Sequence, residues 1–304
     1  MAINNIITHV SDVFKNHYDN ILGRYNQPKE LSIDFLPDLD KKIWGLKKRK
    51  LVVVGGRPSQ GKSDMLLQLG WAFANQNKVV YFFSFEMSKE VCIERLFCAG
   101  MEIDNWETLT GRVSLRTSNE DYNKKLNDFY GKLKNSKFIL VESIGRKLPD
   151  LDKILNTIPD MKPDVVIIDY GNLVDDAGFR SRKEGLDNYI KGFRSLAIHN
   201  DFCAIMGAQI NRGTHEGHKI REPEIWELKD TGELEQVADM IILLHWQYFY
   251  DRDETIKNDY IINIAKNRDG RTAKKKISFY PEWCKFVDRE EEKEMIINDY
   301  TSKY

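Results

Sequence analysis

The chain has 304 residues, of which 41% are hydrophobic and 31% charged, a composition typical of a folded protein with one large core. The net charge of −1 neither favours nor excludes nucleic-acid binding, because a local basic loop can still hold phosphates. No apolar run approaches the ~20 residues that cross a bilayer, and the first residues lack the basic start and apolar stretch of a secretory signal. The four cysteines lack the paired spacing of zinc sites, so we expect buried free thiols in a reducing cytoplasm.

Residues 5–25 carry apolar side chains at three- and four-residue spacing, which predicts an amphipathic helix. The helix needs a surface for its apolar stripe, and this surface is either its own domain or a neighbouring subunit. A Pro-containing segment follows and predicts a linker. We therefore expect three regions: a helix with its linker over residues 1–30, a main domain over residues 31–287 and a charged tail over residues 288–304.

From Leu51 onward, predicted strands and helices alternate. Continuous apolar runs separated by helices predict an α/β fold with a mostly parallel sheet covered on both faces. Near the C-terminus, two alternating segments flank Asn267-Arg-Asp-Gly270 and predict an antiparallel hairpin at the sheet edge. The predicted strands cover residues 51–54, 79–83, 165–168, 202–206, 240–244, 260–265 and 275–279.

The segment from Gly56 to Ser63 reads Gly-Arg-Pro-Ser-Gln-Gly-Lys-Ser and matches the full G-x-x-x-x-G-K-[ST] pattern of a phosphate-binding loop. A predicted strand precedes it and a predicted helix follows, as this motif requires. Backbone N–H groups and the helix N-terminus bind phosphates, Lys62 reaches the β- and γ-phosphates, and Ser63 binds Mg²⁺. The sequence therefore predicts a site for ATP and Mg²⁺. Its predicted nucleotide-binding residues are Gly56, Arg57, Pro58, Ser59, Gln60, Gly61, Lys62 and Ser63.

Three polar residues follow the ends of predicted strands, where they would face the phosphate loop. Asp169 would hold Mg²⁺, although a strand-terminal aspartate is more often a cap or turn residue. Glu86 would orient the attacking water, because a carboxylate at the mouth of a buried strand is costly to place without a purpose. Its alternative role is to cap the helix that begins near Ser88. Gln209 is a weaker candidate for sensing the γ-phosphate.

Read together, six segments resemble the successive motifs of the DnaB-type hexameric helicases in order and approximate spacing. The resemblance covers about residues 31–287 and implies a RecA-like ATPase domain. The phosphate loop alone is unspecific, whereas the later motifs separate this family from other P-loop proteins. The six segments are Arg57–Ser63, Phe83–Lys89, Ile167–Tyr170, Ala208–Arg212, Leu228–Asp239 and Ala265–Gly270.

The resemblance implies a replicative helicase that assembles as a homohexameric ring, moves 5′ to 3′ on single-stranded DNA and unwinds duplex DNA. It implies that Glu86 is the catalytic glutamate, Asp169 the magnesium aspartate and Gln209 the γ-phosphate sensor. Lys266 and Arg268 match the pair that family members insert into the neighbouring subunit's ATP site. On the residues alone, a solvated hairpin is the simpler interpretation of this pair.

The stretch of residues 213–227 predicts a mobile basic loop suited to lining a DNA pore. The resemblance implies that the segment after it follows the DNA backbone, with Lys-Asp-Thr-Gly here in place of the family's Arg-Glu-Ser-Gly. Lysine offers a point charge where arginine offers a bidentate contact, whereas the backbone N–H of Gly232 is unaffected. Such sequence-independent contacts to phosphates suit a translocating motor. The predicted DNA-binding residues are Lys219, Arg221, Lys229, Asp230 and Gly232.

The sequence departs from the family most at its N-terminus. Family members carry a helical domain that collars the ring and engages primase, and residues 1–30 are too few for it, which suggests a phage or other mobile element. We expect single-stranded DNA and further copies of the chain as partners, a loader or primase as candidates, and the cytoplasm of a prokaryotic or phage-infected cell. Two alternatives stay open: a RecA-like recombinase or mediator that forms filaments on DNA, and a regulatory ATP-binding module that never translocates.

Overall fold

The computed structural model divides the chain into two units, residues 1–30 and residues 31–304. In the first unit, the described residues of the predicted amphipathic helix are helical, and their apolar side chains are exposed. These side chains are Val10, Phe14, Tyr18, Ile21 and Leu22. The structure describes residues 10, 14, 18, 21–23, 27–142, 147–169, 179–210, 221–228 and 232–289.

The second unit is built on one sheet, and its described strands follow the order β3-β2-β4-β5-β1-β6-β7-β8-β9. Neighbouring strands pair in parallel from β3 to β6 and antiparallel from β6 to β9. The strands are β1 Leu51–Gly56, β2 Val80–Ser84, β3 Phe138–Glu142, β4 Val165–Asp169, β5 Cys203–Gln209, β6 Met240–His245, β7 Asp259–Asn267, β8 Ala273–Tyr280 and β9 Lys285–Val287.

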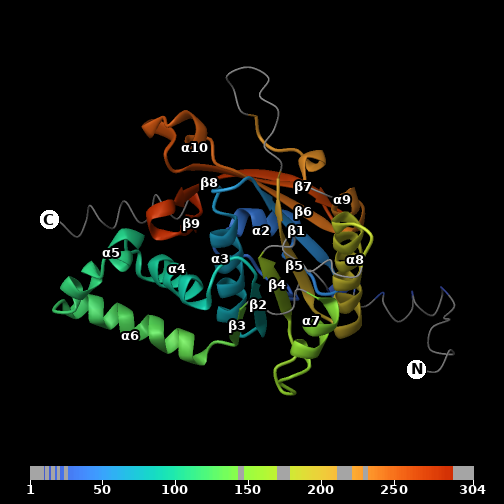
Figure 1. Ribbon diagram of the computed structural model, residues 1–304, viewed down its shortest axis with the longest axis horizontal. Helices are drawn as coiled ribbons and strands as arrows, with labels where there is room; N and C mark the ends of the chain where they lie inside the picture. Colours follow the sequence, from blue (N-terminus) through green and yellow to red (C-terminus); the bar gives the residue numbers. More distant parts are fainter. Residues whose placement is uncertain are drawn as a thin grey trace. The chain divides into compact units, whose positions relative to one another are not determined.

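Helices cover both faces of this sheet, with α3 and α4 on one side and α7 and α8 on the other (Figure 1). The described α-helices are α2 Pro37–Ile43, α3 Lys62–Asn75, α4 Lys89–Met101, α5 Asn105–Leu109, α6 Glu120–Asn135, α7 Leu148–Leu155, α8 Arg182–Asn200, α9 Gly232–Val237 and α10 Tyr248–Asp251. Short 3₁₀ helices are η3 Arg112–Arg116, η5 Ile225–Glu227, η6 Glu254–Ile256 and η7 Pro281–Trp283.

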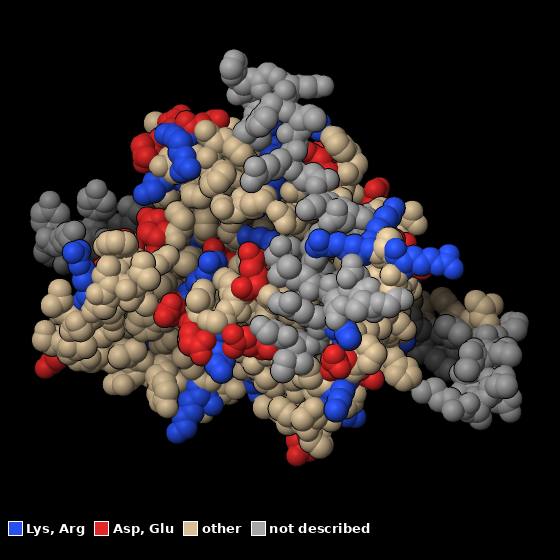
Figure 2. Space-filling view, viewed as in Figure 1, with Lys and Arg blue, Asp and Glu red and all other residues tan. Residues whose placement is uncertain are grey.

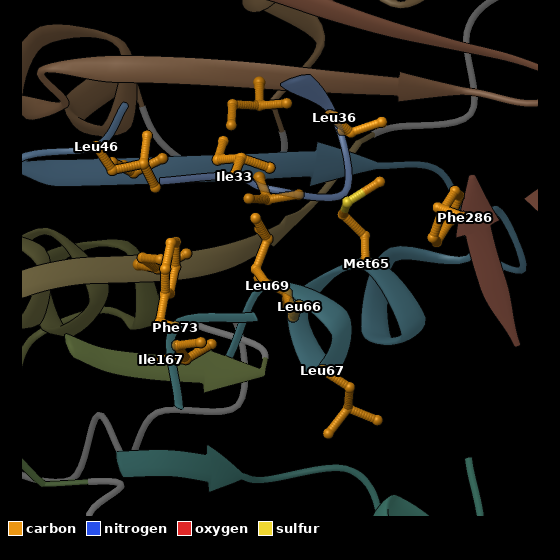
Figure 3. Packing of buried hydrophobic residues seen from close by; sticks show 14 of the residues in the cluster. Ile33, Leu36, Leu46, Met65, Leu66, Leu67, Leu69, Phe73, Ile167 and Phe286 are labelled. Atoms are coloured by element: carbon orange, nitrogen blue, oxygen red, sulfur yellow. The ribbon is translucent and has the colours of Figure 1, made fainter. Parts of the chain in front are cut away.

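The period of two along each strand supplies two cores, one on each face of the sheet. Val52 and Val54 of β1 pack into the core formed with α2 and α3, whereas Leu51 and Val53 pack into the core formed with α7 and α8. Figure 3 shows the first of these cores, where Phe73 of α3 lies beside Ile167 of β4. This double burial explains why the parallel strands read as continuous apolar runs.

The predicted mostly parallel sheet with an antiparallel C-terminal hairpin is confirmed, with three differences. β3 was not predicted, because its side chains are only half-buried and its apolar run is short. The hairpin of β7 and β8 does not form the sheet edge, because β9 pairs with β8. Asp288, the first residue of the predicted charged tail, is buried and pairs with Lys275 of β8; residues 290–304 lie outside the described residues.

All four cysteines are buried and free, as predicted. Among the residues that the structure describes, no helix is both long and apolar enough to cross a membrane. Over the visible face of the molecule, Lys and Arg side chains lie interspersed with Asp and Glu (Figure 2), in keeping with the near-zero net charge.

Candidate nucleotide site

The phosphate loop connects β1 to α3, as the motif predicted. Gly61 precedes α3 with φ +73°, a left-handed conformation that favours glycine. A Cβ at this position would also lie 3.0 Å from ring atoms of both Phe279 and Phe286. The glycine therefore lets the loop turn into the helix N-terminus, where the free N–H groups face the site.

Gln60 anchors the phosphate loop to the segments at β6 and β7. Its side chain is buried, and its Oε1 accepts a hydrogen bond of 2.7 Å from the backbone N–H of Trp246, which directly follows β6. The hydroxyl of Tyr260 in β7 donates to the Gln60 carbonyl. The other seven loop residues line the cavity, so we assign the Gln60 side chain to the support of the loop.

Lys62 and Asp169 form the charged centre of the site. The Lys62 Nζ lies 2.7 Å from the Asp169 Oδ1, and the two side chains are 11% and 0% exposed. The Asp169 Oδ2 is buried and has no hydrogen-bond partner among the described residues. This buried carboxylate oxygen and the hydroxyl of Ser63, in the first turn of α3, fit the oxygen ligands that Mg²⁺ prefers.

Glu86 lines the same cavity, but two of our expectations about it were wrong. Its side chain is exposed, so desolvation gives no reason for its placement. The cap of α4 is Ser88, whose Oγ accepts from the Val91 N–H at 3.4 Å. The pairing of β2 with β4 sets its position instead: the N–H of Phe85, which directly precedes Glu86, donates to the Asp169 carbonyl at 2.8 Å.

Gln209 is the last residue of β5 and pairs in register with Gly56 at the end of β1. Because the two strands are parallel, the Gln209 side chain and the phosphate loop emerge at the same sheet edge. A cavity of about 480 Å³ lies at this edge and is lined by the loop, Glu86 and Gln209. The structure thus brings together the predicted residues of β1, β2 and β5.

The same cavity contains residues that the sequence analysis missed. Arg95 of α4 lines it and donates from Nη1 to the Oδ1 of Asp64 in α3 at 2.7 Å. Burial raises the pKa of the Asp64 carboxyl, although Arg95 opposes this shift. Asn105 and Cys284 also line the cavity. No local pattern in the sequence reveals the contact between Arg95 and Asp64, because the two residues are 31 positions apart and lie on different helices.

Lys266 and Arg268 do not line the cavity. They donate to the carbonyls of Glu235 and Gln236 at the C-terminal end of α9, where cations are favoured. Burial, followed by the neighbouring Arg268 charge, lowers the pKa of Lys266. The predicted pair is therefore placed on a helix end and is not a freely solvated hairpin tip.

Lys266 and Arg268 lie near the amino ends of the parallel strands, whereas the phosphate loop lies at their carboxyl ends. The Arg268 N–H donates to the Asp239 carbonyl at 2.9 Å, and the Asp239 N–H donates to the carbonyl of Leu51, the first residue of β1, at 2.9 Å. The phosphate loop begins at the other end of β1, roughly 15–20 Å away for a strand of this length. Neither cation can therefore serve the cavity of its own chain.

Of the predicted DNA-binding residues, Lys219, Lys229 and Asp230 lie outside the described residues. Arg221 is exposed, pairs with Glu224 at 3.2 Å and lies 4.7 Å from the centre of the Trp226 ring. Gly232 is the first residue of α9.

The expectation of one mobile basic loop over residues 213–227 was wrong for its last part. Residues 225–227 form η5, and Glu227 is buried. The end of the stretch is thus folded against the domain and carries acidic side chains.

The site consists of a phosphate loop between β1 and α3, Asp169 at the end of β4, Glu86 just after β2 and Gln209 at the end of β5. This arrangement defines a P-loop nucleotide-binding protein. The chain belongs to the family described as the DnaB-like helicase C terminal domain, whose model matches residues 33–288. The resemblance seen in the motifs is thereby confirmed.

Curated relatives are replicative helicases. The replicative DNA helicase DnaC of Bacillus subtilis is 27% identical over 287 residues, covering 92% of this chain and 62% of the relative. The replicative DNA helicase DnaB of Geobacillus stearothermophilus is 26% identical with the same coverage of both chains. The chain thus spans about three fifths of the length of these relatives.

Solved structures of this family share the fold. One solved ATPase domain matches with a TM-score of 0.82 and 25% identity, covering 93% of this chain and 99% of that domain. A DnaB-like replicative helicase described with its interactions with primase matches with a TM-score of 0.80 and 25% identity, covering 92% of this chain and 67% of that one. The predicted RecA-like fold is confirmed by these neighbours.

Proposed function

We propose that this chain is the motor domain of a replicative DNA helicase, which hydrolyses ATP and moves along single-stranded DNA. The observation that carries the proposal is the cavity in which the phosphate loop, Glu86 and Gln209 meet beside the Lys62–Asp169 pair. Membership of the DnaB-like family supports the choice of a helicase over a RecA-like recombinase or a regulatory module.

Five polar residues in or beside the cavity have a part in hydrolysis. Ser63 and Asp169 would hold Mg²⁺, which would neutralise charge on the bound phosphates. Lys62 exchanges its contact with Asp169 for the phosphates. Glu86 is exposed at the mouth of the cavity, where it can orient the attacking water, and Gln209 contacts the γ-phosphate.

The site is completed by a second copy of the chain. Lys266 and Arg268 lie at the sheet edge opposite their own cavity, so they reach an ATP site only across a subunit boundary. Such a contact joins two different surfaces, and repeated contacts of this kind close into a ring when the rotation allows. The ring of six subunits and the 5′-to-3′ direction rest on the family resemblance.

Single-stranded DNA is the partner proposed for Lys219, Arg221, Lys229, Asp230 and Gly232. Contacts to phosphates by such residues are independent of sequence, as translocation requires. The apolar stripe of residues 5–25 is proposed to dock on a neighbouring subunit, which would leave residues 1–30 as a docking arm and residues 31–287 as the motor. A loader or a primase is a further proposed partner, in the cytoplasm of a prokaryotic or phage-infected cell.

The test is the ATPase rate with and without single-stranded DNA, together with the unwinding of forks that carry a 5′ or a 3′ tail. We expect DNA to stimulate turnover and only the 5′-tailed fork to be unwound. Glu86→Gln should lower kcat by about 10²–10⁴-fold, the range for loss of a positioned proton acceptor.

Glu90→Gln is the matched control, because Glu90 is an exposed acid on the adjoining helix that does not line the cavity. It should keep the wild-type rate. Stimulated turnover without unwinding from either tail would favour the recombinase or mediator alternative. An unchanged rate in Glu86→Gln would remove the assigned role of this residue.

A further inference from the structure

Arg57 of the phosphate loop is buried in an ion pair that lies outside the hydrolytic machinery. Its Nη2 lies 3.2 Å from the Oε1 of Glu227, and the two side chains are 5% and 2% exposed. Its Nη1 donates to the backbone carbonyl of Arg221 at 3.0 Å. The guanidinium therefore connects the loop that surrounds the phosphates to both ends of the short segment 221–227.

Glu227 also organises this segment. Its Oε2 accepts from the N–H of Glu224 at 2.8 Å, and this contact forms half of a capping box that starts η5. One carboxylate thus uses one oxygen for the phosphate loop and the other for the backbone of its own segment. A displacement of Arg57 must move Glu227, break the pair or break the cap.

The segment is anchored to β1 and β5 immediately after η5. Leu228 pairs with Ile210 through an isolated antiparallel bridge. A Cβ on Gly55 would lie 3.0 Å from the Leu228 Cδ2, so the Leu228 side chain packs directly on the strand that leads into the loop. Residues 221–228 therefore contact both the phosphate loop, at Arg57, and the strand that leads into it, at Gly55.

A buried ion pair is weak evidence of a purely stabilising role. The cost of removing two charges from water often cancels their attraction, and apolar residues of similar size serve stability equally well. A charged pair does differ from an apolar contact in direction and reach, because its geometry is fixed by hydrogen bonds. This property suits a contact whose task is to hold two segments in a defined relation.

We propose that Glu227 is a positioning residue that couples the phosphate loop to the segment beside the DNA-binding residues. When nucleotide enters, the loop adjusts around the phosphates, Arg57 moves with it, and Glu227 and the Arg221 carbonyl follow. The state of the ATP site is thereby transmitted to Arg221 and onward to the DNA contacts. The DNA part of this coupling rests on the proposed function, whereas the link from nucleotide to segment does not.

The experiment uses trypsin, because the link can be read directly at Arg221. Trypsin cleaves after Arg221, and the carbonyl of that peptide bond is the acceptor for Arg57. The full chain is digested briefly without nucleotide and with adenylyl-imidodiphosphate and Mg²⁺, and the fragment 222–304 is quantified by mass. We expect nucleotide to change the rate of this cleavage by about threefold or more in the wild type, as for a shift between two local states.

Three variants separate positioning from stability. Glu227→Gln removes the charge at nearly constant volume and should reduce the nucleotide effect to less than about 1.5-fold while nucleotide still binds, because a neutral side chain holds Arg57 weakly. Glu227→Asp keeps the charge with a shorter reach and should be intermediate. Glu224→Gln is the matched control on the same segment: it removes the charge that pairs with Arg221 and caps η5 but leaves the Arg57 contact. Its ratio of cleavage rates with and without nucleotide should therefore equal that of the wild type, whatever its absolute rate.

Each outcome decides the proposal. A nucleotide effect in Glu227→Gln equal to that of the wild type overturns it, as does an equal loss in Glu224→Gln or the absence of any effect in the wild type. If Glu227→Gln does not fold, Glu227→Asp decides, since an undiminished effect there overturns the coupling. None of these measurements requires DNA or unwinding, so failure here leaves the helicase proposal to its own test. The DNA part of the coupling has its own readout: Glu227→Gln should keep the basal ATPase rate and lose most of the DNA stimulation, and full stimulation would overturn that part.

Discussion

At the scale of single residues, Asp239 joins three parts of the fold. Its Oδ2 accepts from the N–H of Leu51 at 3.0 Å, and Arg194 of α8 donates to both of its oxygens at 3.2 Å. Arg268 approaches it to 3.6 Å. Burial alone would raise the pKa of the Asp239 carboxyl, but the Arg194 guanidinium and the Leu51 N–H more than offset it and hold the pKa below its usual value.

The lowered pKa of Asp239 predicts an acid-sensitive contribution to stability. Because this pKa is lower in the folded than in the unfolded chain, the stabilisation is complete above the unfolded value, near 4, and is lost as the pH falls through the folded value. We expect the urea midpoint of the wild type to fall more steeply below about pH 4 than that of Asp239→Asn. Asp128→Asn, at an exposed position of α6, is the control and should follow the wild type. Parallel curves for the wild type and Asp239→Asn would contradict the prediction.

The sequence could predict site residues that belong to one continuous motif. The phosphate loop is one continuous segment between a strand and a helix, so its pattern carries its own structural context. Glu86 was selected correctly as a cavity residue but for a wrong reason, since it is exposed. The Arg95–Asp64 pair was missed because no spacing in the sequence reveals a contact between two helices.

At the scale of elements, α3 must lie close to the sheet for Lys62 and Ser63 to face the cavity. Gly70, two turns along this helix, allows the approach. A Cβ there would lie 2.6 Å from the Phe138 Cε2 and 3.1 Å from the Ile167 Cδ1. Phe138 cannot retreat freely, because its ring packs against Trp71 and Phe82 with centroids 6.4 and 6.1 Å away.

We therefore expect Gly70→Ala to destabilise the chain. Overpacking costs about 1–3 kcal/mol, which exceeds the roughly 1 kcal/mol that alanine gains over glycine in a helix. Gly131→Ala in α6 is the matched control, since a Cβ there meets nothing within 4 Å. It should stabilise by about 0.4–1 kcal/mol. Urea unfolding of both variants measures the difference, and a stabilised Gly70→Ala would show that α3 is free to shift.

Element-level prediction succeeded where burial was continuous and failed where it was partial. The strands buried on both faces were recognised from their apolar runs, because no polar side chain can face either core. β3 is half-buried throughout and β9 has three residues, so neither carries a clear period. Chain order gave no warning that β9 would cover β8, because strand pairing is decided by tertiary packing.

At the scale of the whole molecule, the chain separates the two halves of the proposed ATP site. The phosphate loop lies at the carboxyl edge of the parallel strands, and Arg268 lies at the amino edge beside Asp239. In the proposed shared site, each chain supplies the phosphate loop to one ATP site and Lys266 and Arg268 to the next. The proposal therefore calls for an asymmetric contact between copies, which the resemblance to a ring-forming family implied but which no local pattern could reveal.

The shared site predicts complementation between two inactive variants. Lys62→Ala lacks a working phosphate loop but keeps Arg268, and Arg268→Ala lacks the cation but keeps its loop. Each alone should hydrolyse ATP at least about 10³-fold more slowly than the wild type, the range for loss of an arginine finger. Mixed and reassembled in equal amounts, they should regain activity, because about one interface in four then pairs an intact loop with an intact cation.

The measurement is the ATPase rate across mixing ratios, which should peak near equal amounts. The control is Arg289→Ala mixed into Lys62→Ala: Arg289→Ala keeps both the loop and Arg268, so its activity should only be diluted. Normal turnover in Arg268→Ala alone, or no gain at any ratio despite exchange of subunits, would mean that the cavity is complete within one chain.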